Sequence, residues 1–248
     1  NTITTLSSEK DANYIPHNGG GAPPAATLPN KKGLNRFVWD MHHDIVPGVP
    51  GVYIEAGFRG HTVIPGTYTA QFNVNGKTLS RDIVIQDNPK YNISKNQYDT
   101  YDSFMEAVES NVTEMHQKVN MLAKAREDIS QVLKTLKEKP AADQTLIDEG
   151  NALLEAIKAW DEKMVQRRSQ AYDDVENFEN KFTAEYLFLI NQSDSSIPLI
   201  TEAAKNRKAE LYQQWMDLRS TANALIQNKI PEYNKRLWNA GIGAISFE

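Results

Sequence analysis

The residues best suited to chemistry gather in one short segment, Asp40 to Asp44, which contains His42 and His43. A further histidine, His61, follows in the same half of the chain. Neutral imidazoles and carboxylates are ligands that Zn²⁺ prefers, with three or four of them around a tetrahedral ion. His42, His43 and Asp44 are therefore the candidate ligands if the chain is a metal-binding module.

The spacing of these residues favours a simpler interpretation. His42 and His43 are neighbours at the end of an expected strand, so their side chains point to opposite faces and at most one can join Asp40. The helical ligand pattern HExxH is absent. We expect polar side chains at a strand end, with no bound metal and no other cofactor.

Other catalytic patterns give no assignable residue. Glycoside hydrolysis needs two carboxylates about 5–5.5 Å or about 6.5–9.5 Å apart. Acidic pairs in the second half, such as Asp173 and Asp174, are consecutive and diverge around a helix. The GxSxG pattern of serine hydrolases is missing, and the absence of Cys excludes thiol catalysis and disulfides. No catalytic residue is predicted within this chain.

Composition indicates a globular protein with few constraints on partners. The 248 residues carry 27 Lys and Arg against 32 Asp and Glu, giving a net charge of −5. The positive charges are scattered, which argues against a nucleic-acid partner. No apolar run approaches the ~18 residues that indicate a membrane span. The length suits one large domain or two ordinary ones.

The first 90 residues predict β structure. Three runs have strand character: 2–6, 34–41 and 52–54. Alternation in the second run places Phe37, Trp39 and Met41 on one face, which we expect to fill a core.

The clearest local signal is Asn75-Gly76, which separates two strand-like runs. Both central residues of a type I′ turn need positive φ, and Asn-Gly supplies them. The predicted hairpin pairs Val74 with Lys77, Phe72 with Leu79, and Tyr68 with Ile83. These pairs share one face, so the register agrees with the apolar pattern.

Beyond residue 90 the apolar period changes from 2 to 3.6, with Ser94 as a suitable helix N-cap. Apolar residues at steps of four and three continue from Tyr101 to Leu136, interrupted by Arg126, and predict one long helix that Pro140 ends. His116 lies one step off this seam and is expected in solvent.

Further helices are predicted over 142–168, 178–190 and from 199 onward, the last one kinked at Pro231. The tail, 241–247, is expected to return as a strand. Short loops between long amphipathic helices predict an up-and-down four-helix bundle over residues 91–248.

Aromatic residues and arginine are the side chains that most often anchor protein interfaces. We therefore select Arg36, Tyr53 and Trp238 as candidates for a binding surface.

Several motifs of the first 90 residues resemble one known family. They are Lys32-Gly33-Leu34-Asn35-Arg36-Phe37-Val38-Trp39-Asp40, Pro65-Gly66-Thr67-Tyr68-Thr69, the Asn75-Gly76 turn and Asp87-Asn88-Pro89. This region is similar to the part that follows the β-propeller in bacterial exported proteins with sortilin-like or BNR (Asp-box) repeats, often labelled glycosyl hydrolase.

The resemblance implies an architecture of two domains. Residues 1–90 would form an immunoglobulin or fibronectin type III-like β-sandwich, and residues 91–248 a helical bundle with a short apolar tail. The Asp-box pattern Ser-x-Asp-x-Gly-x-x-Trp is absent from the chain, so the propeller would lie upstream as its partner. The resemblance also implies export to a bacterial periplasm or cell surface.

The expected function is that of a non-catalytic C-terminal accessory region, which supports the propeller or binds a protein or glycan ligand. The alternative is a part of a glycosyl hydrolase that helps to complete its active site, with His42, His43 and Asp44 as the residues involved.

Overall fold

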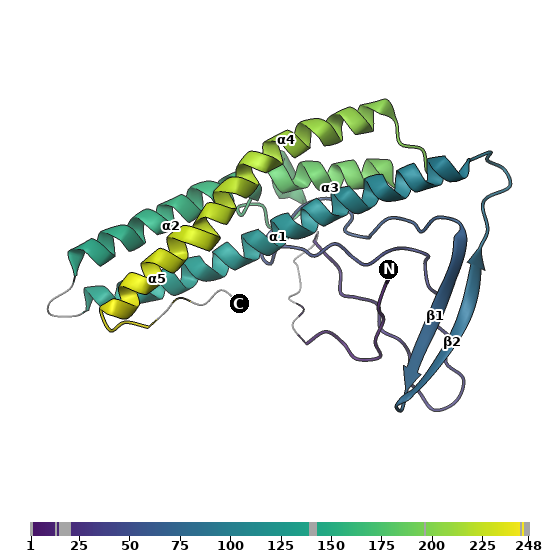
Figure 1. The fold of residues 1–248 in the computed structure, drawn as a ribbon, viewed down its shortest axis with the longest axis horizontal. Helices are drawn as coiled ribbons and strands as arrows, with labels where there is room; N and C mark the ends of the chain where they lie inside the picture. Colours follow the sequence, from purple (N-terminus) through teal and green to yellow (C-terminus); the bar gives the residue numbers. More distant parts are fainter. Residues whose placement is uncertain are drawn as a thin grey trace.

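The computed structural model describes residues 2–12, 14, 21–138, 143–195, 197–243 and 245. Its elements are β1 (Gly66–Val74), β2 (Lys77–Ile85), α1 (Lys95–Lys137), α2 (Gln144–Met164), α3 (Phe182–Ser193), α4 (Glu202–Ala224) and α5 (Ile230–Asn239). A 3₁₀ turn, Tyr172–Glu176, precedes α3, and a π-helical segment, Leu225–Lys229, joins α4 to α5. Helices therefore dominate the described part of the chain (Figure 1).

Helix α1 forms as the sequence predicts. Ser94 caps it through a capping box, in which the Ser94 side chain accepts from the backbone N–H of Gln97 and the Gln97 side chain accepts from that of Ser94. The helix has 43 residues, and its apolar seam is buried from Tyr101 to Leu136. Arg126 is exposed and does not interrupt it, because Ala125, one residue earlier, occupies the buried position between Leu122 and Ile129.

The helices form a bundle of three legs, which are α1, α2 followed by α3, and α4 followed by α5. The prediction of an up-and-down four-helix bundle is therefore wrong. Helices α2 and α3 follow one another along α1 in the opposite direction, and α4 with α5 makes a third leg that runs back beside them (Figure 1). The segment 165–181 does not reverse the chain, so α2 and α3 together occupy one side of α1.

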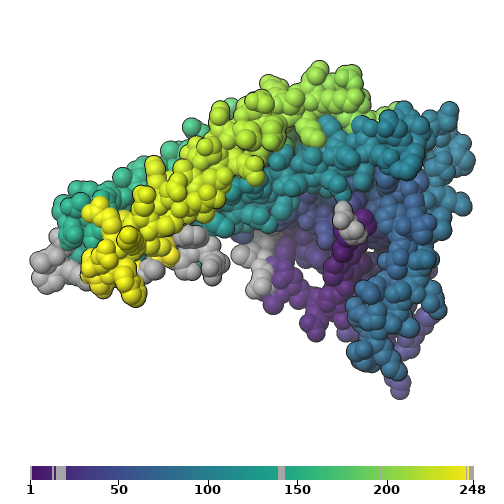
Figure 2. Space-filling model, in the orientation of Figure 1, coloured from purple at the N-terminus to yellow at the C-terminus, as the bar shows by residue number. Residues whose placement is uncertain are grey.

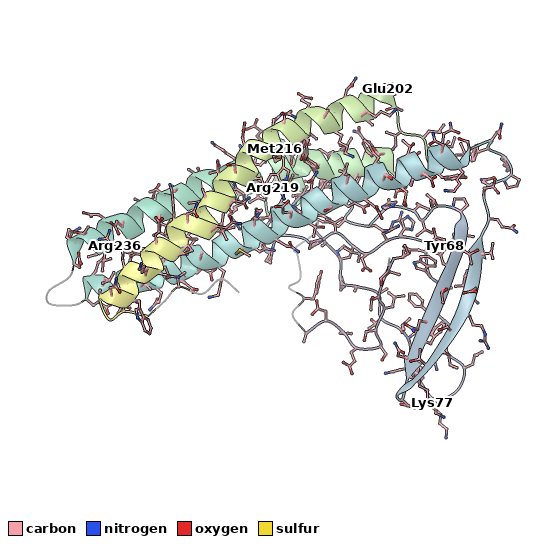
Figure 3. All side chains as sticks on the ribbon, viewed as in Figure 1. Tyr68, Lys77, Glu202, Met216, Arg219 and Arg236 are labelled. Atoms are coloured by element: carbon pink, nitrogen blue, oxygen red, sulfur yellow. The ribbon has the colours of Figure 1, made fainter. Side chains whose placement is uncertain are left out.

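Polar contacts fix the alignment of the third leg. The ammonium group of Lys208 lies over the Phe104 ring, and the Arg219 guanidinium donates to Glu114 at 2.7 Å (Figure 3). Arg236 of α5 pairs with Glu149 of α2. None of the helices in the described residues combines the length and apolarity needed to cross a bilayer.

The expected β-sandwich of residues 1–90 is not present. The only sheet among the described residues is the two-stranded antiparallel β1–β2. The predicted strands 2–6 and 52–54 are not formed, and Ser7 makes an isolated bridge to Thr27 instead. An alternating pattern specifies a buried face only where a second layer covers it, and this segment supplies no second sheet.

The predicted strand 34–41 is not formed, and this segment joins no sheet. Met41 adopts φ +60°, which lies outside the extended region. Phe37 and Met41, expected in a core, are exposed, whereas Trp39 is half-buried with its ring edge-on to Tyr68 at 6.3 Å. The core prediction for this face is therefore wrong for two of its three members.

The segment that follows packs on the helices rather than on a sheet. Val46, Val49, Val52, Ile54 and Phe58 are buried in the same hydrophobic cluster as the α1 seam. The loop-rich half of the chain therefore shares the core of the bundle.

The hairpin forms with the register that the sequence predicts, including the pairs Tyr68 with Ile83 and Phe72 with Leu79. Asn75 and Gly76 have φ values of +48° and +73°. The hairpin extends away from the bundle (Figure 2), with Tyr68 near its base and Lys77 at its tip (Figure 3).

The C-terminal tail does not form the predicted strand in its described residues, 241–243 and 245. Ile245 is buried and its backbone exchanges two hydrogen bonds with the side chain of Asn234 in α5. The remainder of the predicted strand lies outside the described residues.

Gly150 of α2 lies where three helices meet. The Tyr233 hydroxyl of α5 donates to the Leu146 carbonyl at 2.9 Å. A Cβ at position 150 would lie 2.5 Å from that hydroxyl oxygen and 2.7 Å from Leu133 Cδ2 of α1. The glycine is therefore required by the close approach of its neighbours.

We expect Gly150→Ala to lower the free energy of unfolding by up to about 2 kcal/mol, because overpacking costs about 1–3 kcal/mol and helix propensity offsets about 1 kcal/mol of it. Urea denaturation followed by circular dichroism measures the change. Asn151→Ala, at an exposed position of the same helix, is the matched control and should not destabilise. Equal or greater stability of Gly150→Ala would contradict the packing described for this crossing.

Candidate functional site

Two short segments pair beside helix α1 and bring three histidines together. His42 and Thr62 form an isolated antiparallel bridge, supported by a hydrogen bond from the His43 N–H to the His61 carbonyl at 3.0 Å. This register places His43 directly opposite His61. Gly60 permits the close approach, since a Cβ there would lie 2.4 Å from the Asp44 carbonyl oxygen.

His61 is fully buried and lies between two carboxylates of α1. Its Nδ1 is 3.0 Å from both carboxylate oxygens of Glu109, and its Nε2 is 3.2 Å from Oδ1 of Asp102. Its backbone N–H also donates to Glu109, at 2.7 Å. The imidazole therefore ties the paired segments to the first turns of α1.

The electrostatics of the two stacked histidines differ. Burial alone lowers the pKa of His61, but hydrogen bonds and charges from Glu109 and Asp102 outweigh it and raise the pKa above its usual value. Burial, followed by the charge of His61, lowers the pKa of His43. The rings stack with centroids 4.0 Å apart. The ring of His43 thus covers the ring of His61, whose protonated form the two carboxylates favour.

His42 belongs to a separate network on the other face of the paired segments. Its Nε2 lies 3.1 Å from the Thr62 hydroxyl, which donates to Asp194 at the end of α3. The Tyr101 hydroxyl donates to the same carboxylate oxygen at 2.6 Å, and burial raises the pKa of Tyr101. The opposite directions of His42 and His43 agree with the alternation expected for neighbours in an extended chain.

The candidate ligands His42, His43 and Asp44 do not converge on one point. Asp44 is exposed and accepts from the Thr4 hydroxyl at 2.5 Å. The ligand atoms that do converge within the described residues belong to His43, His61 and Asp102, all within 4.8 Å of one another. Only one of the three candidates belongs to this group.

The candidates for a binding surface are divided. Arg36 is exposed, and Trp238 is exposed at 73% on α5. Tyr53 is buried at 8%, and its N–H donates to the Ser169 carbonyl, so its assignment to a surface is wrong. It lies in the segment that packs on the bundle, where we had expected a short strand.

His116 of α1, expected in solvent, is fully buried, as His61 is. Its Nδ1–H donates to the Pro47 carbonyl at 2.5 Å, and its Nε2 has no hydrogen-bond partner in the described part of the chain. Burial lowers its pKa to about 4. The helical wheel places it beside the seam, and the loop 46–54 covers that flank, which the sequence does not reveal.

Sequence reasoning did not select Asp102, Glu109 or Asp194. On α1 the two carboxylates are seven residues apart, two turns along the same face, which is the available signal. Acidic residues at this spacing are common on solvated helix faces. Only the position of His61, contributed by a distant segment, distinguishes them.

A cavity of about 390 Å³ lies between α3 and α4 and shares no residue with the histidine cluster. Its lining mixes apolar side chains with five polar residues, Glu185, Gln192, Ser193, Thr201 and Arg207. Arg207 is paired with Glu185 and Glu210.

The histidine cluster itself holds interacting acids and bases that can exchange protons or bind a cation.

Comparison with known proteins gives no match: no protein-family model, no curated protein and no solved structure is similar to this chain.

The burial of neutral His116 predicts a loss of stability in acid. With a folded-state pKa of about 4 against about 6.5 in the unfolded chain, the unfolded state binds the additional proton between these values. The stabilisation is therefore present above about pH 6.5 and declines as the pH falls through the window. We expect His116 to contribute a decrease of roughly 2–3 kcal/mol in the free energy of unfolding between pH 7 and pH 4.

Urea denaturation at several pH values, with a chelator present, measures this decrease. His116→Gln keeps a side-chain N–H for the Pro47 carbonyl but does not titrate, so its unfolding free energy should fall less steeply with acid than that of the unaltered chain. Parallel pH profiles for the two proteins would show that His116 is not the source.

Proposed function

We propose that this chain is a non-catalytic accessory region that supports a larger exported protein by packing its β1–β2 hairpin against a β-propeller domain of the same protein. The observation that carries the proposal is the apolar face of the hairpin, most of which is exposed in the described residues.

The two faces of the hairpin differ in chemistry. Phe72, Val74, Leu79 and Ile83 share one face by register and are each between 41% and 63% exposed. The same face also carries Lys77 and Arg81, and the opposite face carries Gln71, Asn73, Thr78 and Ser80, with the exposed Val84 near its base. Exposed apolar side chains gathered on one side of a strand pair are typical of a surface that another domain covers.

The stability of the hairpin supports the same proposal. A two-stranded hairpin is at best marginally stable in water unless further strands or a helix cover its apolar face. Here the hairpin points away from the bundle, and its only ring contact in the described residues is that of Trp39 with Tyr68 (Figure 2). A covering domain would supply the missing layer.

The chemistry of the chain is consistent with an accessory role. The histidines and carboxylates beside α1 are engaged with one another, and the cavity between α3 and α4 holds an arginine already paired with two glutamates. The resemblance to the region after the propeller in sortilin-like and BNR-repeat proteins identifies the expected partner and implies export. The reading frame upstream of Asn1 should then encode Asp-box blades.

The test uses the chain and the upstream domain as separate polypeptides. We expect the immobilised chain to retain the propeller domain, and Phe72→Asp to weaken that binding by about 10- to 100-fold, since a charge would be buried in the interface. Gln71→Asp, on the opposite face of the same strand, is the matched control and should bind as the unaltered chain does. Both positions are exposed, so neither change should alter bundle stability by more than about 0.5 kcal/mol.

Failure of the unaltered chain to bind, or equal loss with the two variants, would overturn the proposal. So would an upstream reading frame without Asp-box blades.

A further inference from the structure

We propose that His43, His61 and Asp102 form a binding site for one divalent transition-metal ion of the zinc class, with Glu109 orienting His61 as its hydrogen-bond acceptor. The inference is independent of the proposed function and would stand if the hairpin had another partner.

The separation of the ligand atoms suits such an ion. Nε2 of His61 and Oδ1 of Asp102 are 3.2 Å apart. Two ligands at about 2.0–2.1 Å from a tetrahedral zinc ion lie roughly 3.3 Å from each other. His43, His61 and Asp102 each offer one ligand atom, and these three atoms lie within 4.8 Å of one another. The His61 and Asp102 atoms therefore already stand at the spacing of two zinc ligands.

Glu109 holds His61 in the tautomer that a metal requires. Its carboxylate accepts from Nδ1–H and from the His61 backbone N–H, so it fixes both the ring and the main chain. With Nδ1 protonated, the lone pair of Nε2 is the one available to an ion beside Asp102. A carboxylate that accepts from the far nitrogen of a ligand histidine is the usual arrangement in protein zinc sites.

His43 supplies the third ligand after a change of side-chain rotamer. Its ring is stacked on His61 with an interplanar angle of 18°, so the in-plane lone pairs of the two rings do not meet at one point. The ring is half-buried, and in the described residues it has no hydrogen bond of its own to break. The backbone bond from His43 to the His61 carbonyl keeps the two histidines opposite one another during this rotation.

The donor set defines the class of ion. Two imidazole nitrogens with one carboxylate oxygen suit zinc and its neighbours, whereas calcium and magnesium prefer oxygen ligands alone. Ligand nitrogens must be unprotonated to bind a metal ion, so the affinity should increase with pH. Three protein ligands leave a fourth position for water.

Bound metal would have a mechanical consequence. It would join the paired segments, 41–43 and 61–63, to α1 through coordination bonds from His43, His61 and Asp102. The site would therefore act as a clamp between the loop-rich half of the chain and the bundle.

The test is a titration of the purified chain, without an affinity tag and after dialysis against a chelator, with Zn²⁺ in a calorimeter. Co²⁺ is used in parallel, because its visible absorption reports coordination. We expect one ion per chain, with tetrahedral Co²⁺ bands. Asp102→Asn and His43→Ala each remove one ligand at a partly exposed position, and each should weaken binding by at least about 100-fold. Glu109→Gln should weaken it by about 10- to 100-fold while the Co²⁺ spectrum remains tetrahedral.

His42→Asn is the matched control, since it alters the adjacent histidine but faces the Asp194 network. It should bind with unchanged stoichiometry and affinity. Circular dichroism confirms that each variant is folded. Absence of binding to the unaltered chain, or binding that His43→Ala and Asp102→Asn leave unchanged, would overturn the proposal. Equal loss with His42→Asn would do the same.

Discussion

The structure depends on one continuous apolar seam along helix α1. Its members, from Tyr101 to Leu136, are nearly all without exposed surface, and every other helical leg takes its place against them. Burial of apolar surface is the dominant favourable contribution to folding, and this seam buries such surface along most of the longest helix. The loop segment 46–58 is ordered by the same surface. Helix α1 therefore serves as the template on which the loop-rich half becomes structured.

The polar contacts near the start of α1 fix the position of the loop-rich half of the chain against this helix. Apolar contacts are non-directional and tolerate sliding, whereas the two oxygens of Glu109 around His61 specify one position. The Asp194 network, with hydrogen bonds from Tyr101 and Thr62, specifies the other face of the same segment. Two networks on opposite sides of one short bridge thus define a unique register where no sheet is present to do so.

The parts of the fold that the sequence predicts are those governed by local rules. The N-cap of α1 at Ser94, the long helix itself and the Asn75-Gly76 hairpin each follow from contacts between residues close in sequence. The β-sandwich was wrong because an alternating strand such as 34–41 needs a second sheet, and local patterning cannot show whether the chain provides one. The four-helix topology was wrong because segment 165–181 connects two helices in series.

The site was predictable only in part. Alternation correctly separates His42 from His43, and it indicates that at most one of them can join a given ligand set. His61 contacts Asp102 and Glu109, which lie 41 and 48 residues further along the chain, so no spacing rule identifies these residues as partners. His116 was misjudged for the same reason, because a distant loop covers a helix position that would otherwise face water.

Because α1 is one continuous helix, the bundle can also act as a rigid spacer between its two ends. From Met105 to Leu136 the helix rises about 1.5 Å per residue, or roughly 45 Å. Helix α5, which carries the exposed Trp238, ends near the far end of α1, and the hairpin lies beside its near end (Figure 1). Two bodies held at these ends would be kept at a fixed spacing, since a helix without proline or glycine along this span has no built-in hinge.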